Sequence, residues 1–354
     1  MYRLLPRIVR HRDADLLDRV FGIYALLIVA NLAVWAWAFY AFLGHPLMLG
    51  TALLAYGFGL RHAVDADHIA AIDNVTRKLM QEGKRPVGVG FWFALGHSAV
   101  IALVALGVAI TTAELPSRFD RLRDVGGVVG TLVSTAFLFA IATINIVILV
   151  GIWQRFREVR RGGAFHNEDL DLLLNRRGLM SRLLRPLFRL IAQSWHMLPL
   201  GFLFGLGFET ATEVALLGIS ATEAGRGMSV WSIMLFPALF AAGMSLIDTT
   251  DGILMLGAYN WAFVKPMRKL YYNLVITAVS VVVALLIGGI EGLGLIGDQL
   301  GLKGRFWDGV GTLNASFNAL GFAVIGVFVL AWLVSLVIYR YARIDDGERA
   351  ATER

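Results

Sequence analysis

Two imidazoles and two carboxylates stand within seven residues of one another in the segment Arg-His-Ala-Val-Asp-Ala-Asp-His-Ile at residues 61–69. Imidazole nitrogen combined with carboxylate oxygen, without thiolate, suits Ni(II), Co(II), Zn(II) or Cu(II), whereas sites made of oxygen alone suit Mg(II) or Ca(II). The surrounding residues 47–72 are otherwise apolar enough to cross a bilayer, where ionisable side chains are costly and functional by default. We therefore expect a site for a transition-metal dication inside a membrane. Its candidate ligands in this segment are His62, Asp65, Asp67 and His68.

The geometry of these four residues depends on whether the segment forms one unbroken helix. At about 100° per residue, His62, Asp65 and His68 fall within an arc of about 120°, whereas Asp67 points about 140° away from His62. Either Asp67 faces a neighbouring helix, or the helix unwinds locally here. An ion pair with Arg61, four residues earlier, is the alternative to a ligand role for Asp65.

Three further apolar segments carry the other polar residues of the membrane interior. They are His97 with Ser98, then Glu209, Thr212 and Glu213, then Asp248 and Asp251. Together with the first segment they bring six carboxylates against one arginine, and at about 2.5 to 3.5 kcal/mol each these would cost on the order of 15 to 20 kcal/mol if unpaired. The carboxylates must therefore face a hydrated or cation-filled cavity. We expect His97 to close the metal site and the other acidic and threonine side chains to line the ion's path.

The composition places the whole chain in a membrane. Of its 354 residues, 57% are hydrophobic and 16% charged, whereas a soluble domain averages about 25% charged residues. The absence of cysteine excludes disulfides, thiolate metal sites and cysteine nucleophiles. The net charge of +6 comes from basic residues dispersed in short loops, which argues against a nucleic-acid partner. No GxxxxGK[ST] or HExxH sequence is present, so we expect neither an ATPase activity nor an intramembrane zinc protease.

Apolar stretches of spanning length predict an all-α polytopic membrane protein with eight transmembrane helices. They lie near residues 21–43, 47–72, 88–112, 126–152, 197–220, 230–258, 271–297 and 314–341. Of the 32 lysines and arginines, 25 lie at the termini and in the loops on the same side, and six lie on the opposite side. This bias predicts that both termini are cytoplasmic in the cell (inner) membrane, with the lipid bilayer as a partner.

The two halves of the chain resemble each other. Phe58-Gly59-Leu60 matches Phe204-Gly205-Leu206 at an offset of 146, and Phe93-Ala94-Leu95-Gly96 matches Phe240-Ala241-Ala242-Gly243 at an offset of 147. Helices two to four and five to seven would then form an inverted repeat, the arrangement in which alternating-access transporters place a substrate site at the repeat interface. Helices one and eight would be peripheral. Pairs of glycines four residues apart, such as Gly201 with Gly205, indicate close helix packing.

This pattern predicts a single transmembrane transporter domain over residues 1–354. The domain has two halves, which an Arg-rich cytoplasmic loop with an amphipathic pattern separates. A cytoplasmic tail lies at each end. These parts are the tail 1–20, the first half 21–152, the loop 153–196, the second half 197–341 and the tail 342–354.

At these residues the chain resembles the nickel/cobalt transporter (NiCoT) family. The family signature His-x4-Asp-His stands here as His62, Asp67 and His68, and further motifs match at residues 95–98, 206–213 and 243–252. The resemblance implies an eight-helix permease of the cytoplasmic membrane, with the metal handled by the three signature residues. It also implies that transport requires Asp65, His97, Asp248 and Asp251. One departure is Glu209, at a position that the resemblance associates with aspartate.

The hypothesis is a secondary transporter that imports Ni(II), with Co(II) as a further candidate. The metal is its substrate, so we expect no resident cofactor, no ATPase subunit and no enzymatic activity. Two alternatives stay open: a membrane-embedded metalloenzyme, for which seven histidines are few, and a carrier of the same fold for another cation, for which the imidazoles would be surplus. The sequence leaves metal preference, proton coupling and oligomeric state undecided.

Overall fold

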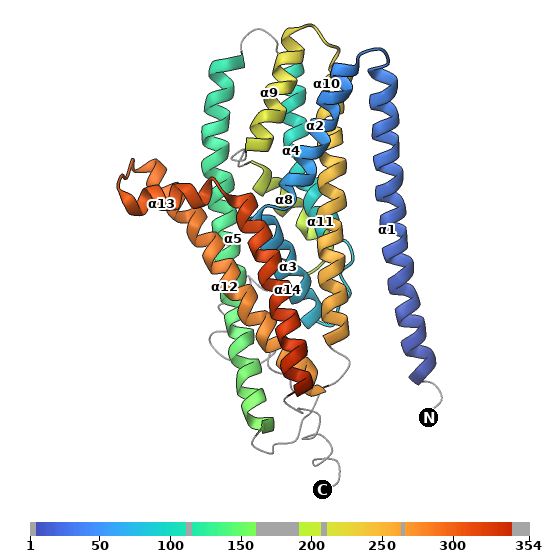
Figure 1. The fold of residues 1–354 in the computed structure, drawn as a ribbon, viewed down its shortest axis with the longest axis vertical. Helices are drawn as coiled ribbons and strands as arrows, with labels where there is room; N and C mark the ends of the chain where they lie inside the picture. Colours follow the sequence, from blue (N-terminus) through green and yellow to red (C-terminus); the bar gives the residue numbers. More distant parts are fainter. Residues whose placement is uncertain (1–4, 111–114, 161–190, 207–210, 263–265, 342–354) are drawn as a thin grey trace. The chain divides into compact units, whose positions relative to one another are not determined.

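The computed structural model describes residues 5–110, 115–160, 191–206, 211–262 and 266–341, and every regular element within these ranges is a helix (Figure 1). The all-α prediction is therefore confirmed for the described residues. In chain order the helices are α1 (Leu5–Ala41), α2 (Pro46–His62), α3 (Ala66–Gln81), α4 (Val89–Ile110), α5 (Leu115–Arg160), the short η1 (Ser194–His196), α8 (Met197–Gly205), α9 (Ala211–Gly225), α10 (Val230–Ile233), α11 (Leu235–Ala262), α12 (Pro266–Gln299), α13 (Arg305–Asn314) and α14 (Phe317–Tyr341).

Five stretches of helix are long and apolar enough to cross a membrane, or up to seven if each bent pair counts as one span. The five are Asp15–Ala41, Val89–Ile110, Gly127–Gly151, Val230–Ala258 and Leu274–Gln299, and the bent pairs are Pro46–His62 with Ala66–Gln81 and Arg305–Asn314 with Ala319–Ala331. Each overlaps an expected span. The remaining expected span, 197–220, is divided between α8 and α9 around residues 207–210, which lie outside the described ranges. The count of eight thus stays a prediction. Most of the expected Arg-rich loop, residues 161–190, also lies outside them.

The structure decides between the two alternatives left open for residues 47–72, in favour of a broken helix. α2 ends at His62 and α3 begins at Ala66, because Asp65 adopts an extended backbone (φ −69°, ψ 146°) at the N-cap of α3. Aspartate is a residue type that favours the N-cap position. The local unwinding offered above is confirmed. Because the helix is broken, His62 shares no helix face with Asp65 and His68.

The chain divides into two compact units, each assembled from three stretches of sequence. Unit 1 comprises residues 1–64, 85–133 and 193–253, and unit 2 comprises residues 65–84, 134–192 and 254–354. Two of the boundaries fall inside the long helices α5 and α11. Unit 1 therefore contains α2, α4, α8 and α9, whereas unit 2 contains α3, α12, α13 and α14.

In unit 1, glycines let α4 and α8 approach until their backbones touch. A Cβ atom added to Gly96 of α4 would lie 2.0 Å from the carbonyl oxygen of Leu198, and one added to Gly201 of α8 would lie 2.1 Å from that of Phe93. Real Cβ atoms essentially never come this close to another atom. The packing role predicted for the glycine pair of α8 is confirmed, because only glycine permits this crossing.

The helices α2 and α11 of unit 1 meet in the same way. A Cβ atom on Gly59 of α2 would lie 2.1 Å from the carbonyl oxygen of Phe240, and one on Gly243 of α11 would lie 2.7 Å from that of Tyr56. Fully buried aromatic and aliphatic side chains fill the space around these crossings, among them Phe236. The glycines thus fix which helices touch, and the apolar core holds them together.

Unit 2 contains several buried polar side chains that bond to one another across helices. On α3, Asp73 accepts a hydrogen bond from Ser280 of α12 (2.7 Å), and Asn74 accepts one from Asn145 of α5 (2.6 Å). These bonds join three helices through their polar groups, which satisfies side chains that would be costly in an apolar interior.

The same helix corrects a second expectation. The expected spans 47–72 and 88–112 place Arg77 and Lys78 in the loop between them, but α3 continues to Gln81 and buries both side chains. Arg77 donates to Asn74 (2.8 Å), and the ammonium of Lys78 donates to the carbonyl oxygen of Ile191. A count of charges along the sequence cannot reveal such partners, and for that reason it assigned these residues to a loop.

The crossing of α4 and α8 can be tested by adding a single methyl group. Gly201→Ala would force the two backbones apart, so we expect a loss of about 1 to 3 kcal/mol in stability, the range for overpacking. Gly218→Ala on α9 is the control, since a Cβ there meets nothing within 4 Å. Thermal unfolding in detergent, followed by tryptophan fluorescence, measures both variants. Equal melting temperatures for the two would contradict the backbone contact.

Candidate metal centre

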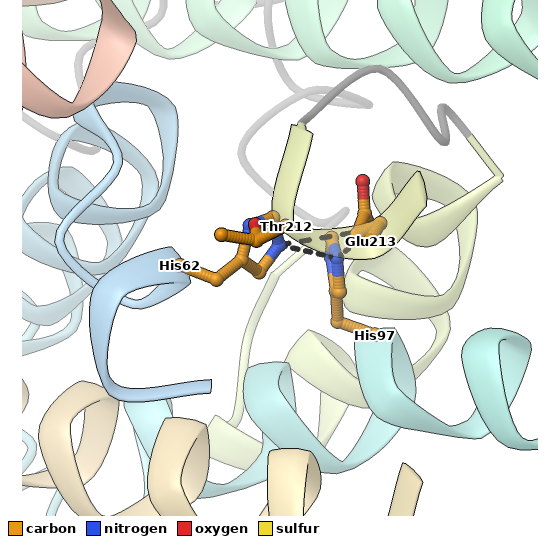
Figure 2. Close-up of polar contacts among 4 residues, drawn as sticks. All are labelled: His62, His97, Thr212 and Glu213. Atoms are coloured by element: carbon orange, nitrogen blue, oxygen red, sulfur yellow. Dashed lines mark hydrogen bonds and ion pairs between the residues drawn. The ribbon is translucent and has the colours of Figure 1, made fainter. Parts of the chain in front are cut away.

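Three helices of unit 1 bring four polar side chains together (Figure 2). His62 is the last residue of α2, His97 lies within α4, and Thr212 and Glu213 stand in the first turn of α9. Figure 2 shows the two imidazoles pointing towards one another, with the carboxylate of Glu213 beside them. Each of the four residues is at most 4% exposed.

The ligand atoms of this cluster converge on one point. The Nε2 atoms of His62 and His97 lie 2.9 Å apart, and the Oε1 atom of Glu213 lies 3.0 Å from Nε2 of His97 and 3.7 Å from Nε2 of His62. The hydroxyl of Thr212 lies 3.5 Å from Nδ1 of His62. Ligand atoms about 2.1 Å from a metal, at angles of about 90° to 110°, are roughly 3.0 to 3.4 Å apart. The separations of 2.9 and 3.0 Å fit neighbouring corners of one coordination sphere, and the separation of 3.7 Å corresponds to a wider angle at the metal.

Aromatic rings hold the imidazoles in place. The ring of Phe240 lies 5.4 Å from the ring of His62, and the ring of Phe93 lies 6.1 Å from that of His97. Both phenylalanines are fully buried and also supply the backbone carbonyls at the glycine crossings. Gly205 of α8 packs against the carbonyl of His97 itself, where an added Cβ would lie 2.8 Å from the oxygen. The packing of α4 therefore positions the ligand that α4 carries.

The electrostatics of the cluster favour a cation. One carboxylate stands beside two imidazoles, and neutral imidazole and carboxylate are the ligands that divalent transition metals take. His62 ends α2, at the negative end of the helix dipole. A buried carboxylate without compensating charge is costly, and a bound dication would remove that cost.

A family model described as high-affinity nickel-transport protein (NicO) matches residues 48–338 of the chain. The chain belongs to this family. It is 58% identical over 348 residues to a high-affinity nickel transport protein of Cupriavidus necator, covering 98% of this chain and 99% of that protein. It is 54% identical to the hydrogenase nickel incorporation protein HupN of Bradyrhizobium diazoefficiens, with coverage of 92% and 86%. It is 40% identical to the cobalt transport protein NhlF of Rhodococcus rhodochrous, with coverage of 91% of each chain. No solved structure shows a significant match.

In this NicO chain, the rest of the signature begins α3 in unit 2. Asp65 is buried at the N-cap, Asp67 is half-buried in the first turn, and His68 is fully buried. The covalent chain separates His68 from His62 by only six residues. The contacts described for unit 1 do not include Asp65, Asp67 or His68. Their role as metal ligands therefore stays a prediction.

The acidic residues expected along the ion's path are placed in part. Asp248 is fully buried on α11, and its carbonyl oxygen would lie 1.9 Å from a Cβ atom on Gly90 of α4. Gly90 precedes His97 by two helical turns, which is about 10 Å along the axis of α4. Asp251 follows on α11 and is half-buried. Glu209 lies outside the described residues, so its role is still an expectation.

The structure changes the role expected for Glu213. The sequence assigned it to the path, yet its carboxylate contacts both histidines of unit 1. The sequence showed only that Glu213 belongs to the motif at residues 206–213. A motif does not predict which side chains of other helices its residues contact. Glu291, a buried carboxylate of unit 2 in a glycine-rich stretch of α12, belongs to none of the motifs identified in the sequence.

The cluster predicts that His97 and Glu213 each contribute to metal affinity. His97→Ala and Glu213→Gln should each weaken binding of Ni(II) to the purified protein by about 100-fold or more, because even the loss of a group that only orients a ligand costs about 10- to 100-fold. Equilibrium dialysis with radioactive nickel measures the dissociation constants.

Two variants serve as matched controls. His45→Ala removes an exposed histidine before α2, and Glu223→Gln removes a carboxylate of α9 that pairs with Arg226. Both should bind nickel as the unmodified protein does. If Glu213→Gln binds as tightly as Glu223→Gln, the carboxylate is not a ligand.

Proposed function

We propose that this chain imports Ni(II) into the cytoplasm as a secondary transporter, with Co(II) as a second substrate. The observation that carries the proposal is the convergence of two imidazole nitrogens and one carboxylate oxygen within 3.7 Å, buried between α2, α4 and α9, of which α4 is long and apolar enough to cross a membrane. Membership of the NicO family supports nickel, and the relative named a cobalt transport protein supports cobalt. The alternatives of a metalloenzyme and of a carrier for another solute have no such support.

The proposed ligand set combines the cluster with the family signature. His62, His97 and Glu213 hold the partly dehydrated ion, and Asp67 and His68 complete its coordination from the start of α3. The break between α2 and α3 favours this arrangement, because discontinuous membrane helices expose backbone carbonyls and helix ends that coordinate cations. The carboxylates at the start of α3 offset the positive end of its dipole, which would otherwise repel the ion.

The metal then leaves along an acidic path. Asp248 and Asp251 of α11, with Glu209, provide oxygen ligands beyond the histidines. Oxygen ligands hold Ni(II) less firmly than imidazole does, so the ion can be passed on. No step in this sequence makes or breaks a covalent bond, and we therefore assign the chain no enzymatic activity.

The membrane potential provides a sufficient driving force. Moving a dication across about 100 mV, negative inside, releases roughly 4.6 kcal/mol, which corresponds to about a 2000-fold concentration ratio. The distribution of basic residues supports cytoplasmic termini in the cell membrane, with the metal entering from the opposite side.

The inverted repeat belongs to the same proposal, together with eight membrane helices in one transporter domain. Its support lies in the glycine crossings of unit 1. Gly59 and Gly243 join α2 to α11, while Gly96 and Gly205 join α8 to α4. The offset of 146 relates Gly59 of α2 to Gly205 of α8, and the offset of 147 relates Gly96 of α4 to Gly243 of α11. Corresponding helices therefore use corresponding glycines at their crossings.

The transport proposal predicts the behaviour of His62→Ala. The unmodified protein in vesicles should accumulate labelled nickel when the interior is made electrically negative. The variant should accumulate none, because it lacks a ligand, while the amount of protein in the membrane stays the same. His45→Ala should transport normally. Normal uptake by His62→Ala would remove this residue from the site.

The donor set also predicts which metals compete. Excess unlabelled Ni(II) or Co(II) should suppress uptake of labelled nickel, whereas Mg(II) and Ca(II) should not, since they prefer sites made of oxygen. Uptake is measured at a fixed potential with each metal added outside. Equal inhibition by Mg(II) would favour a site of carboxylates alone and exclude the histidines as ligands.

A further inference from the structure

A buried glutamate in unit 2 takes no part in the site described above. Glu291 lies on α12 and is 6% exposed. Its Oε2 atom accepts a hydrogen bond from the hydroxyl of Ser134 on α5 (2.7 Å) and a longer one from that of Thr135 (3.4 Å). Ionisable residues inside membrane helices are costly, and in transporters they commonly carry protons.

The glutamate sits at a tight crossing of α12 with α5. A Cβ atom on Gly288 would lie 3.2 Å from Cβ of Leu138, and one on Gly292 would lie 3.1 Å from the methyl carbon of Thr135. The two glycines flank the glutamate on α12 and allow α5 to come close. The hydroxyls are therefore held against the carboxylate by packing.

The partners suit both protonation states of the glutamate. A serine or threonine hydroxyl can donate a hydrogen bond to a carboxylate, and it can also accept one from a carboxylic acid. Glu291 can thus gain or lose a proton without leaving its neighbours. The metal cluster differs, since there the carboxylate contacts imidazole nitrogens.

The titratable groups around Glu291 come from α12 itself and from the helices that pack against it. The part of α5 over residues 126–153 contains no titratable residue, and α14 has none before Tyr339. On α13 the titratable residues are Arg305 and Asp308, and on α12 itself the exposed Asp298 lies two turns beyond the glutamate.

The charged groups of α3 lie far from Glu291 along α12. On α3, Asp73 contacts Ser280, which lies eleven residues before Glu291 on nearly the same face of α12. This separation is about 16 Å along the helix. Arg77 and Lys78 follow on α3, beyond Asp73.

We propose that Glu291 binds the proton that is coupled to nickel uptake. This proposal rests on the proposed function and extends it by naming the coupling ion. The carboxylate takes up one proton from the outer side to become a carboxylic acid, and it releases that proton towards the cytoplasm in the same transport cycle. The predicted topology supports outer access, because α12 begins next to a basic cytoplasmic loop and Glu291 lies in its distal half.

The experiment uses the full chain in vesicles with the membrane potential held at zero. An imposed pH gradient, acid outside, should drive accumulation of labelled nickel by the unmodified protein. Glu291→Gln keeps the size and hydrogen bonding of the side chain but cannot release a proton. Its accumulation driven by the pH gradient should fall to the level of empty vesicles.

A second measurement separates coupling from folding. Exchange of internal unlabelled nickel for external labelled nickel, at equal pH on both sides, needs no proton release and should proceed in Glu291→Gln as in the unmodified protein. Glu223→Gln is the control and should behave normally in both assays. Infrared difference spectra between alkaline and acidic buffer should show a carboxylic-acid band that Glu291→Gln lacks.

Each result decides the matter. Accumulation by Glu291→Gln equal to that of the unmodified protein would overturn the proposal, as would an infrared band that survives the substitution. Loss of exchange as well as accumulation would assign Glu291 to the metal path or the fold, and would also overturn it. If the unmodified protein ignores the pH gradient yet accumulates nickel under an imposed potential, proton coupling fails and the proposed function stands.

Discussion

The cost of burying ionisable groups governs unit 1. His62, His97 and Glu213 come from three helices and meet in an interior that is almost closed to solvent. A carboxylate in such a place needs compensating positive charge, and two imidazole nitrogens facing it offer ligands rather than charge. A dication satisfies all three groups at once. Under the proposed function, the cluster is a site that a bound metal stabilises, with ligands few enough to let the metal leave.

Glycines determine how closely the helices that carry this cluster pack. Because Gly96, Gly201 and Gly205 leave no space between α4 and α8, neither helix can move towards the other. Any displacement of α8 is transmitted to the backbone of His97, which lies in direct contact with Gly205. Rigid crossings of this kind convert small helix movements into changes in the distance between ligands. A transporter requires such changes, since binding and release must alternate.

The sequence predicted which residue types could bind a metal, but it did not predict which side chains of other helices they contact. The signature around His62 and the apolar stretches predicted a metal site in an all-α membrane protein. Hydropathy could not predict the break at Asp65, because a break alters hydrogen bonding without altering composition. The contact of Glu213 with both histidines depends on how α9 packs. Arg77 was predicted in a loop because its charge suggested exposure to solvent. Its burial in α3 depends on polar partners that only the fold brings to it.

Two buried glutamates show how neighbours decide what a carboxylate binds. Glu213 faces imidazole nitrogens, which are poor ligands for hard cations such as Mg(II) but hold transition metals well. Glu291 faces hydroxyls, which are weak metal ligands but adapt to either protonation state of an acid. The same side chain thus suits a dication in unit 1 and a proton in unit 2. The distinction arises entirely from the residues that the neighbouring helices present to it.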